Sequence, residues 1–404
     1  NVTAEAGLKT LVWHWPGSSW PPSSDNENLY VVDGSQPAAV QMSTASVDFE
    51  KYAIANKDFK EVLYRPKFIN KTGVGCVIDE LPEEDDSALA SGRLNRHKMS
   101  QITNVELSHA QGEVGLDTPP FDLINSPVKP AEGWANAPEG ALEFTIVTSG
   151  GVTRRPCLIL KNAQGQYDTI AVYHSKKADA PIASMKEGEL VVNALDQVNV
   201  NGENIDCTRS YKALEIAADG SQIRMWIGTA YDIHNDSKWH PTTFYKEIVE
   251  NVGYVPGFTQ LGGKNFEFSQ KLLQPVWQNY MRWQAGALNY AAHSGFKMIF
   301  SHLHMIDAQG HIFWHYAHDA GETDGTPEGY QKLIENCYVD ADEYIGSFLP
   351  LLDEGWTLMI VSDHGLLCRE DVPPLLGDPG GVSVRVMQEL GFTVVKKDEN
   401  GNDL

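Results

Sequence analysis

The chain has 404 residues, a formal net charge of −23, 42% hydrophobic residues and 21% charged residues. This length is enough for two or three domains, and the composition is that of a globular protein. No apolar run approaches the ~18–20 residues of a membrane helix, so we expect no membrane span. Nucleic-acid surfaces are usually basic, so the charge argues against one, although a small anionic substrate can bind where metal ions supply positive charge.

Five cysteines lie far apart and form no CxxC pair: Cys76, Cys157, Cys207, Cys337 and Cys368. This spacing argues against a zinc ribbon or a thioredoxin-like site and favours buried or free thiols, with at most one or two disulfides. The cysteines do not fix the compartment, and an exported or periplasmic location is favoured. The sequence opens on Asn1 without a signal peptide, so we expect a processed, cleaved or partly represented chain.

Residues 1–115 are predicted to form the first part of an α/β core. A short helical end precedes a strand at 9–13, and Pro16-Gly17 signals a turn. Residues 43–54 look mixed and partly helical.

The pattern changes near Asp117, where prolines mark a boundary. Short β-type runs follow, separated by Gly, Asn and Asp, at 142–147, 155–161, 168–173, 189–192 and 223–227. Several strands at such close spacing predict a β-rich module, inserted over residues 116–240.

Residues 241–404 are predicted to be the second part of the core. A helix is expected over 266–293, with Pro275 at a kink or junction, and another over 327–349. Apolar strands are expected at 296–300 and 356–361, on either side of the second helix. Strand, helix and strand in this order predict an α/β fold with a parallel sheet covered by helices on both faces.

Potential metal ligands follow both of these strands. Asp307 and His311 come after the first, and Asp363 and His364 after the second. Functional groups gather beyond the carboxyl ends of the strands in open α/β sheets, so the two pairs are expected to face one crevice. Carboxylate and imidazole are ligands that suit Zn²⁺.

The spacing within each pair agrees with this role. Asp307 and His311 stand one helical turn apart and would share a side of the helix. Asp363 and His364 would point to opposite faces of a regular strand, so they must lie where the strand breaks, and Gly365 gives the backbone that freedom.

Each motif alone is ambiguous, because an Asp-His-Gly run can be a helix cap and turn. Their joint occurrence after two strands favours the metal site. For His302 and His304 we favour core or supporting positions, and His315, one turn beyond His311, is an alternative ligand.

The runs from Asp307 to His311 and from Ser362 to Gly365 resemble the metal-ligand motifs of type I phosphodiesterase/nucleotide pyrophosphatase proteins, within the alkaline phosphatase superfamily. The opening residues 2–10 and 15–18 are similar to the segment that follows the nucleophile in that family. The resemblance covers residues 1 to about 110 and 240–395. The β-rich module is not a usual part of the family's pattern.

This resemblance implies an alkaline-phosphatase-like, mainly parallel sheet flanked by helices, and a metal-dependent phosphohydrolase acting on phosphodiesters or phosphomonoesters. Asp307 and His311 would hold one divalent ion, and Asp363 and His364 the other, with zinc as the expected metal. The substrate would be a small anionic phosphoester, and the reaction would pass through a covalent phospho-enzyme intermediate.

The sequence also departs from the family's pattern. An Asp at the end of the first strand, a Thr or Ser nucleophile and a late His are expected in the family, and no His follows His364 here. We therefore expect the nucleophile to lie outside this chain, and weak metal binding with little turnover from this polypeptide alone.

Three alternatives share the same ligands or fold. A sulfatase or phosphonate hydrolase differs mainly in its nucleophile. An enzyme like the cofactor-independent phosphoglycerate mutases would normally carry a different inserted domain. A catalytically inactive binding protein on this fold is the third.

Overall fold

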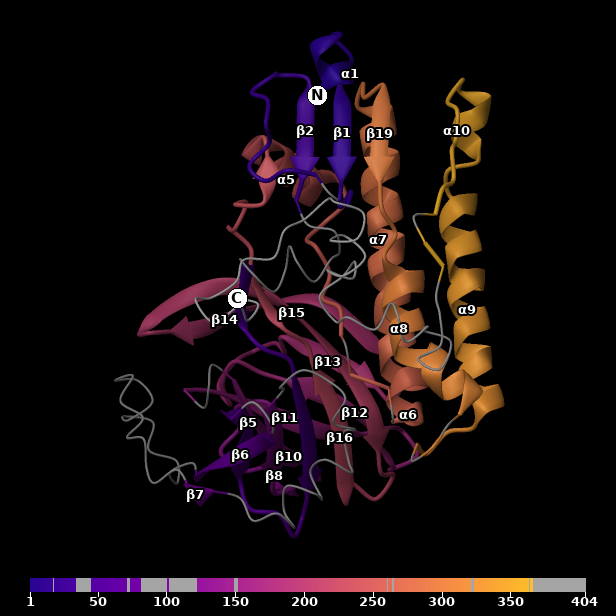
Figure 1. The fold of residues 1–404 in the computed structure, drawn as a ribbon. Coiled ribbons are helices and arrows are strands. Elements are labelled where there is room, and N and C mark those ends of the chain that lie inside the picture. The colour runs from indigo at the N-terminus through magenta and orange to yellow at the C-terminus, as the bar shows by residue number, and fades with distance from the viewer. Residues whose placement is uncertain are drawn as a thin grey trace, which may run out of the picture.

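The computed structural model describes residues 1–16, 18–33, 45–70, 73–80, 100–101, 122–148, 152–259, 261–263, 265–319, 321, 323–362 and 364–365. For 62–70, 73–80, 100–101 and 122 only the backbone is described. Figure 1 shows a small sheet above two larger sheets, with the long helices along one side. This mixture of sheets and helices confirms an α/β protein, and the alkaline-phosphatase-like arrangement stays a prediction.

The small sheet has the order β18-β2-β1-β19. Its strands are β1 (Thr10–Trp13), β2 (Leu29–Val32), β18 (Trp239–His240) and β19 (Met298–Ser301). The central strand β1 pairs in parallel with both β2 and β19, and β18 pairs antiparallel with β2. The predicted strands at 9–13 and 296–300 are therefore confirmed, and they are direct neighbours.

The side chains of β1 alternate between two cores, as the two-residue period of a strand requires. Leu11 and Trp13 enter the large core with helices α5 (Thr242–Asn251) and α7 (Gln274–His293). Val12 points the other way and packs with Ala4 of α1 (Val2–Glu5). Both faces of the small sheet are thus apolar, which agrees with its parallel pairing.

The two larger sheets are mostly antiparallel. The ten-stranded sheet contains β3 (Ser46–Asp48), β4 (Lys51–Asn56), β5 (Val62–Asn70), β6 (Gly73–Glu80), β7 (Ser100–Gln101), β8 (Asp122–Ser126), β14 (Leu190–Val200), β15 (Glu203–Ile216), β16 (Gln222–Ile227) and β17 (Ala230–Asp232). The five-stranded sheet contains β9 (Lys129–Pro130), β10 (Leu142–Thr148), β11 (Thr153–Lys161), β12 (Tyr167–Val172) and β13 (Ala183–Lys186). The five predicted β-type runs fall on β10, β11, β12, β14 and β16, so these predictions are confirmed.

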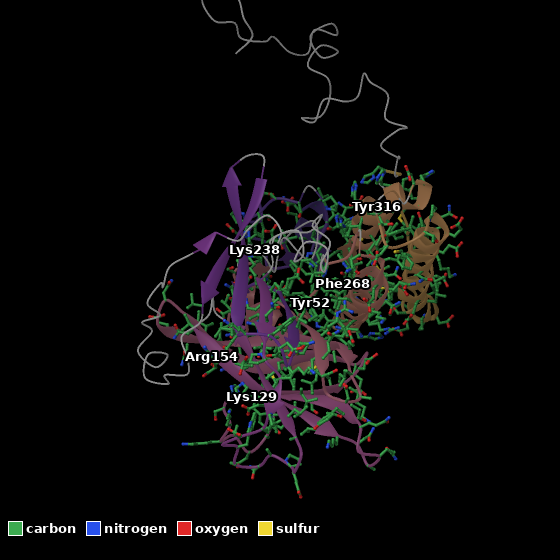
Figure 2. All side chains as sticks on the ribbon, turned by 90° about the horizontal axis from the view of Figure 1, so that it is seen from below. Tyr52, Lys129, Arg154, Lys238, Phe268 and Tyr316 are labelled. Carbon is green, nitrogen blue, oxygen red and sulfur yellow. The ribbon has the colours of Figure 1, made fainter. Side chains whose placement is uncertain are left out.

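The ten-stranded sheet is covered on both faces. In β16, Ile223 and Met225 belong to the core shared with the five-stranded sheet, whereas Trp226 belongs to the core shared with the helices. Tyr52 of β4 lies on the helical side, where its ring meets the ring of Phe268 at a centroid distance of 5.0 Å (Figure 2). This sheet therefore joins the β-rich part of the chain to the helical part.

Residues 43–54 differ from the prediction. The described part of this segment contributes to β3 and β4, where a partly helical segment was expected. The reason is tertiary, because β4 pairs with β16 and β8 and is buried along most of its length. The boundaries at 115 and 240 stay predictions. The strands β3, β4, β5 and β6 precede residue 115 and belong to the same ten-stranded sheet as β14–β17, which favours an earlier start of the β-rich module.

The helical layer contains α6 (Phe266–Phe268), a π-helical turn η3 (Ser269–Leu273), α7, α8 (Met305–His318), α9 (Pro327–Gly346) and α10 (Pro350–Asp353). The predicted junction at Pro275 is confirmed, because the π-turn ends just before it. Pro275 has no N–H to donate to the preceding turn, and a wider turn accommodates that loss. Thr326 caps α9 by accepting a hydrogen bond from the Gly329 N–H at 3.1 Å.

The predicted strand at 356–361 is wrong for the described structure. Residues 356–362 have no regular secondary structure, and Met359, Ile360 and Val361 are 81%, 66% and 69% exposed. A β-type sequence forms a strand only when it finds a pairing edge, and within the described residues this segment has no ladder partner.

Three cysteines have described side chains, and all three are buried free thiols: Cys157, Cys207 and Cys337. This agrees with the expectation of buried or free cysteines. In the described part of the chain, no helix has the length and apolar character to cross a membrane.

A buried ion pair ties the two larger sheets together. Arg155 of β11 donates from Nε and Nη2 to Asp196 of β14, at 3.0 and 2.7 Å, and also to the Gln197 carbonyl at 2.7 Å. Both side chains of the pair are nearly inaccessible to solvent. Because each charge depends on the other for its compensation, the pair fixes how the two sheets meet.

We predict that Arg155→Met lowers the free energy of unfolding by about 3–5 kcal/mol, because Asp196 would keep a buried carboxylate without its cation. Urea denaturation measures this loss. The control is Arg282→Met, which removes an exposed pair with Glu343 and should cost about 0–1 kcal/mol. Equal losses in the two variants would contradict a structural role for the buried pair.

Candidate functional site

The site begins where β19 ends. The His302 N–H donates to the Trp13 carbonyl at 3.1 Å, which extends the β1–β19 pairing by one bond. The chain then turns into α8, with His304 at the N-cap position. The first turn of α8 is thereby fixed at the carboxyl edge of the small sheet, the place where α/β proteins collect functional groups.

Asp307 lies in this first turn and meets three imidazoles. Its Oδ2 is 3.1 Å from His304 Nε2, and its Oδ1 is 3.2 Å from His311 Nε2. His364 Nε2 lies 3.7 Å from the same Oδ1. The structure therefore brings Asp307, His311 and His364 together, although His364 belongs to a distant segment.

Accessibility divides these groups into a shielded carboxylate and open imidazoles. The Asp307 side chain is 21% exposed, whereas His311 and His364 are 69% and 54% exposed. Asp307 Oδ1 is shielded from solvent, and within the described residues no well-aligned hydrogen bond reaches it. Such an oxygen beside two imidazole nitrogens suits a cation, which would satisfy its unused acceptor capacity.

The residues present therefore fit a metal ion by the type of their ligand atoms, a carboxylate oxygen and imidazole nitrogens, and not by a preformed ligand geometry. Within the described residues, no group of three or more His, Cys, Asp or Glu side chains has a geometry that could hold an ion. Asp363, the fourth predicted ligand, lies outside the described residues.

The neighbouring histidines differ in their positions. The rings of His302 and His304 meet edge to face at 5.0 Å, and the His304 side chain is 18% exposed. Their core or supporting roles stay predictions. His315 is exposed on α8, with its ring against Tyr316. Within the part of the chain that the structure describes, no ion pair or hydrogen bond joins His315 to Asp307, and its role as an alternative ligand stays a hypothesis.

His14 follows the central strand β1 directly and has a backbone φ of 52°, which is uncommon for a residue other than glycine. Its side chain is buried, and Nε2 lies 3.0 Å from the Tyr280 hydroxyl of α7. The strained backbone at the carboxyl edge of the sheet is therefore supported by packing against α7. In the sequence His14 is one residue of an aromatic-rich segment, and nothing there marks its conformation.

A polar network anchors the end of β19 to the helices. Gln284 of α7 donates from Nε2 to the His302 carbonyl and to the Tyr344 hydroxyl, both at 3.0 Å. Ser301 also hydrogen-bonds to Tyr344, and burial nonetheless raises the pKa of Tyr344 to about 12. Gln284 was not predicted from the sequence. The sequence feature that could have identified it is a single amide within the apolar stripe of a predicted helix.

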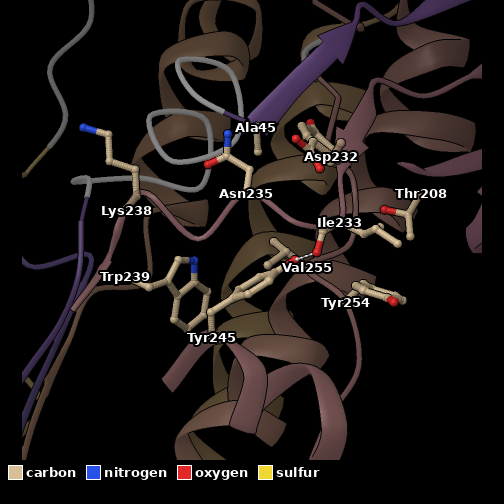
Figure 3. A pocket seen from close by; sticks show the side chains of 11 residues that line it. Ala45, Thr208, Asp232, Ile233, Asn235, Lys238, Trp239, Tyr245, Tyr254 and Val255 are labelled. Atoms are coloured by element: carbon tan, nitrogen blue, oxygen red, sulfur yellow. Dashed lines mark hydrogen bonds between the residues drawn. The ribbon is translucent and has the colours of Figure 1, made fainter. Parts of the chain in front are cut away.

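A separate cavity lies between β17, β18 and α5, lined by Asp232, Trp239, Tyr245 and Tyr254 among others (Figure 3). Its volume is about 30 Å³, which is room for about two water molecules. Tyr245 donates to the Ile233 carbonyl at 2.9 Å, so its hydroxyl is already used. This cavity is too small for a phosphoester, and the Asp307 cluster remains the candidate site.

Residues 206–368 match the model of the family described as type I phosphodiesterase / nucleotide pyrophosphatase, which is part of the alkaline phosphatase superfamily. The match confirms the family resemblance over that range, which includes all four predicted metal ligands. It begins within β15, and the predicted resemblance of residues 1 to about 110 lies outside it. No curated protein and no solved structure matches the chain.

We predict that Gln284→Leu lowers the free energy of unfolding by about 1–3 kcal/mol, because the His302 carbonyl and the Tyr344 hydroxyl lose their shared donor in a buried place. Chemical denaturation measures it. Asn289→Leu is the matched control on α7, since its amide donates to the Ala285 carbonyl at a partly buried position and to the Ser347 carbonyl at an exposed one. A larger loss from Asn289→Leu would show that the anchor is not at Gln284.

Proposed function

We propose that this protein is a metal-dependent phosphoester hydrolase with its catalytic centre at Asp307. The family match supports hydrolysis of a phosphoester. The observation that carries the proposal is the meeting of Asp307 with His311 and His364, which come from two segments and lie at one edge of the small sheet. Each of these two segments contains a motif that resembles the family's metal ligands.

In this proposal Asp307, His311, Asp363 and His364 hold two divalent cations, with zinc as the first candidate. When bound, two such ions supply positive charge to the attacking and leaving oxygens of a displacement at phosphorus. The residues of this chain contribute the carboxylates and imidazoles that fix the position of that charge. We assign no nucleophile among the described residues.

His304 acts on Asp307 in this arrangement. Its Nε2 lies beside Oδ2, which leaves Oδ1 directed toward His311 and His364. A carboxylate held by an imidazole on one oxygen presents the other in a fixed direction, as supporting residues commonly do around metal ligands. The substrate would be a small phosphoester anion at the open side, where His311 and His364 are exposed.

We predict that the protein binds zinc and that Asp307→Asn weakens this binding beyond the ~10–100-fold range typical of supporting residues, because a ligand itself is lost. Competition with a chromophoric zinc chelator gives the affinity, and hydrolysis of a 4-nitrophenyl phosphodiester gives the activity. Asp342→Asn is the control, since Asp342 is an exposed carboxylate on the outer side of α9.

Equal zinc affinity in the Asp307→Asn, Asp342→Asn and unchanged proteins would refute the site. The same preparations separate the alternatives. Hydrolysis of 4-nitrophenyl sulfate or of a phosphonate monoester that is faster than hydrolysis of the phosphodiester would identify a sulfatase or a phosphonate hydrolase instead. Zinc binding without hydrolysis of any of these substrates would agree with slow turnover by this polypeptide or with a binding protein on the same fold.

A further inference from the structure

We propose that Gln309 is a positioning residue that sets the rotation of α8 and thereby aims Asp307 and His311 toward the candidate site. The expected effect on zinc binding rests on the proposed function. The evidence for the positioning role is the set of hydrogen bonds that Gln309 makes to α7 and α9, none of which involves a predicted metal ligand. Gln309 stands midway between the two predicted ligands in the sequence. At about 100° per residue, it lies on the side of α8 opposite to both.

The inner side of α8 is otherwise apolar. Met305 and Phe313 are fully buried and belong to the large core, as does Ala317. Apolar contacts of this kind tolerate small rotations and shifts of a helix, because they have little directionality. Gln309 is also fully buried, so a directional group stands within this apolar face.

Gln309 joins α8 to both neighbouring helices. Its Oε1 accepts from Cys337 Sγ of α9 at 3.0 Å and from Gln274 Nε2 of α7 at 3.3 Å. Gln274 is held in turn, since its Oε1 accepts from Asn336 Nδ2 at 3.2 Å. A single acceptor thus receives donors from two helices, which fixes one rotation of α8 against the pair.

The donors on α7 and α9 have other partners. Gln274 Nε2 donates to the Leu333 carbonyl at 2.7 Å, and the same carbonyl lies 3.2 Å from Cys337 Sγ as an alternative acceptor for its single hydrogen. Removing the Gln309 amide would therefore leave neither donor unsatisfied. Its own Nε2 is buried and finds no partner among the described residues, so an apolar side chain would remove an uncompensated group.

These contacts separate fold stability from position. A residue that only stabilises the core is detected in unfolding experiments, whereas a residue that only positions a helix is missed by them. Gln309 contributes directional bonds at little net stability, which is how a buried polar group can specify the register of packed helices. Loss of the bonds should then act on the opposite side of α8, where Asp307 and His311 lie.

The test is Gln309→Met in the full chain. We expect an unfolding midpoint within experimental error of the unchanged protein and a zinc affinity about 10-fold weaker by chelator competition, as for supporting residues of metal sites. Hydrogen exchange should show lower protection over α8 with unchanged protection over α9. Cys337→Ser keeps a donor to Oε1 and should retain the original zinc affinity.

The matched control is Gln278→Met, an identical change on α7 whose amide contacts Asp340 of α9 and not α8. It should leave zinc affinity and α8 exchange unchanged. Gln309→Met with unchanged zinc affinity would overturn the proposal. If the unchanged protein binds no zinc, the proposed function fails, and exchange over α8 decides the positioning role: equal protection in the variant and the parent overturns it.

Discussion

The candidate site depends on the parallel pairing of β1 with β19. Trp13 stands opposite Ser301 in this ladder, and the next bond joins the Trp13 carbonyl to the His302 N–H. One strand comes from the beginning of the chain and the other from its last third. Because β1 is central and buried on both faces, β19 has a single register, and α8 therefore starts at a fixed height above the sheet.

The packing of α7, α8 and α9 sets the rotation of α8 about its own axis, and this rotation decides where its side chains point. Apolar packing holds α7, α8 and α9 together, but it does not by itself choose a rotation. Buried amides lie between the helices at intervals, with Gln284 near the end of β19 and Gln274 near the start of α7. Each amide joins backbone and side-chain groups of different elements, so directionality comes from hydrogen bonds and cohesion from apolar burial.

Local patterns in the sequence were enough to predict elements that form within a short stretch. The helix over 327–349 and the strands at 9–13 and 296–300 follow from apolar periodicity, and the predicted sharing of one helical side by Asp307 and His311 follows from their spacing. The strand at 356–361 and the partly helical 43–54 failed for one reason, since pairing partners far along the chain decide whether a β-type segment becomes a strand. The hydrogen bonds of Gln284 and Gln309 could not be predicted from the sequence for the same reason, because their partners lie far along the chain.

The distribution of positive charge explains why metal ions are needed in the proposed function. Arg155, Arg209 and Lys51 are buried in the β-rich sheets and paired with Asp196 or Asp48. The segments that build the site, residues 302–319 and 356–365, contain no Lys or Arg. In a protein of net charge −23, a phosphoester anion at the described site would meet the Asp307 carboxylate beside imidazoles, with no cation from these two segments. Binding would then be opposed by electrostatic repulsion unless cations held by those same groups reversed the local field.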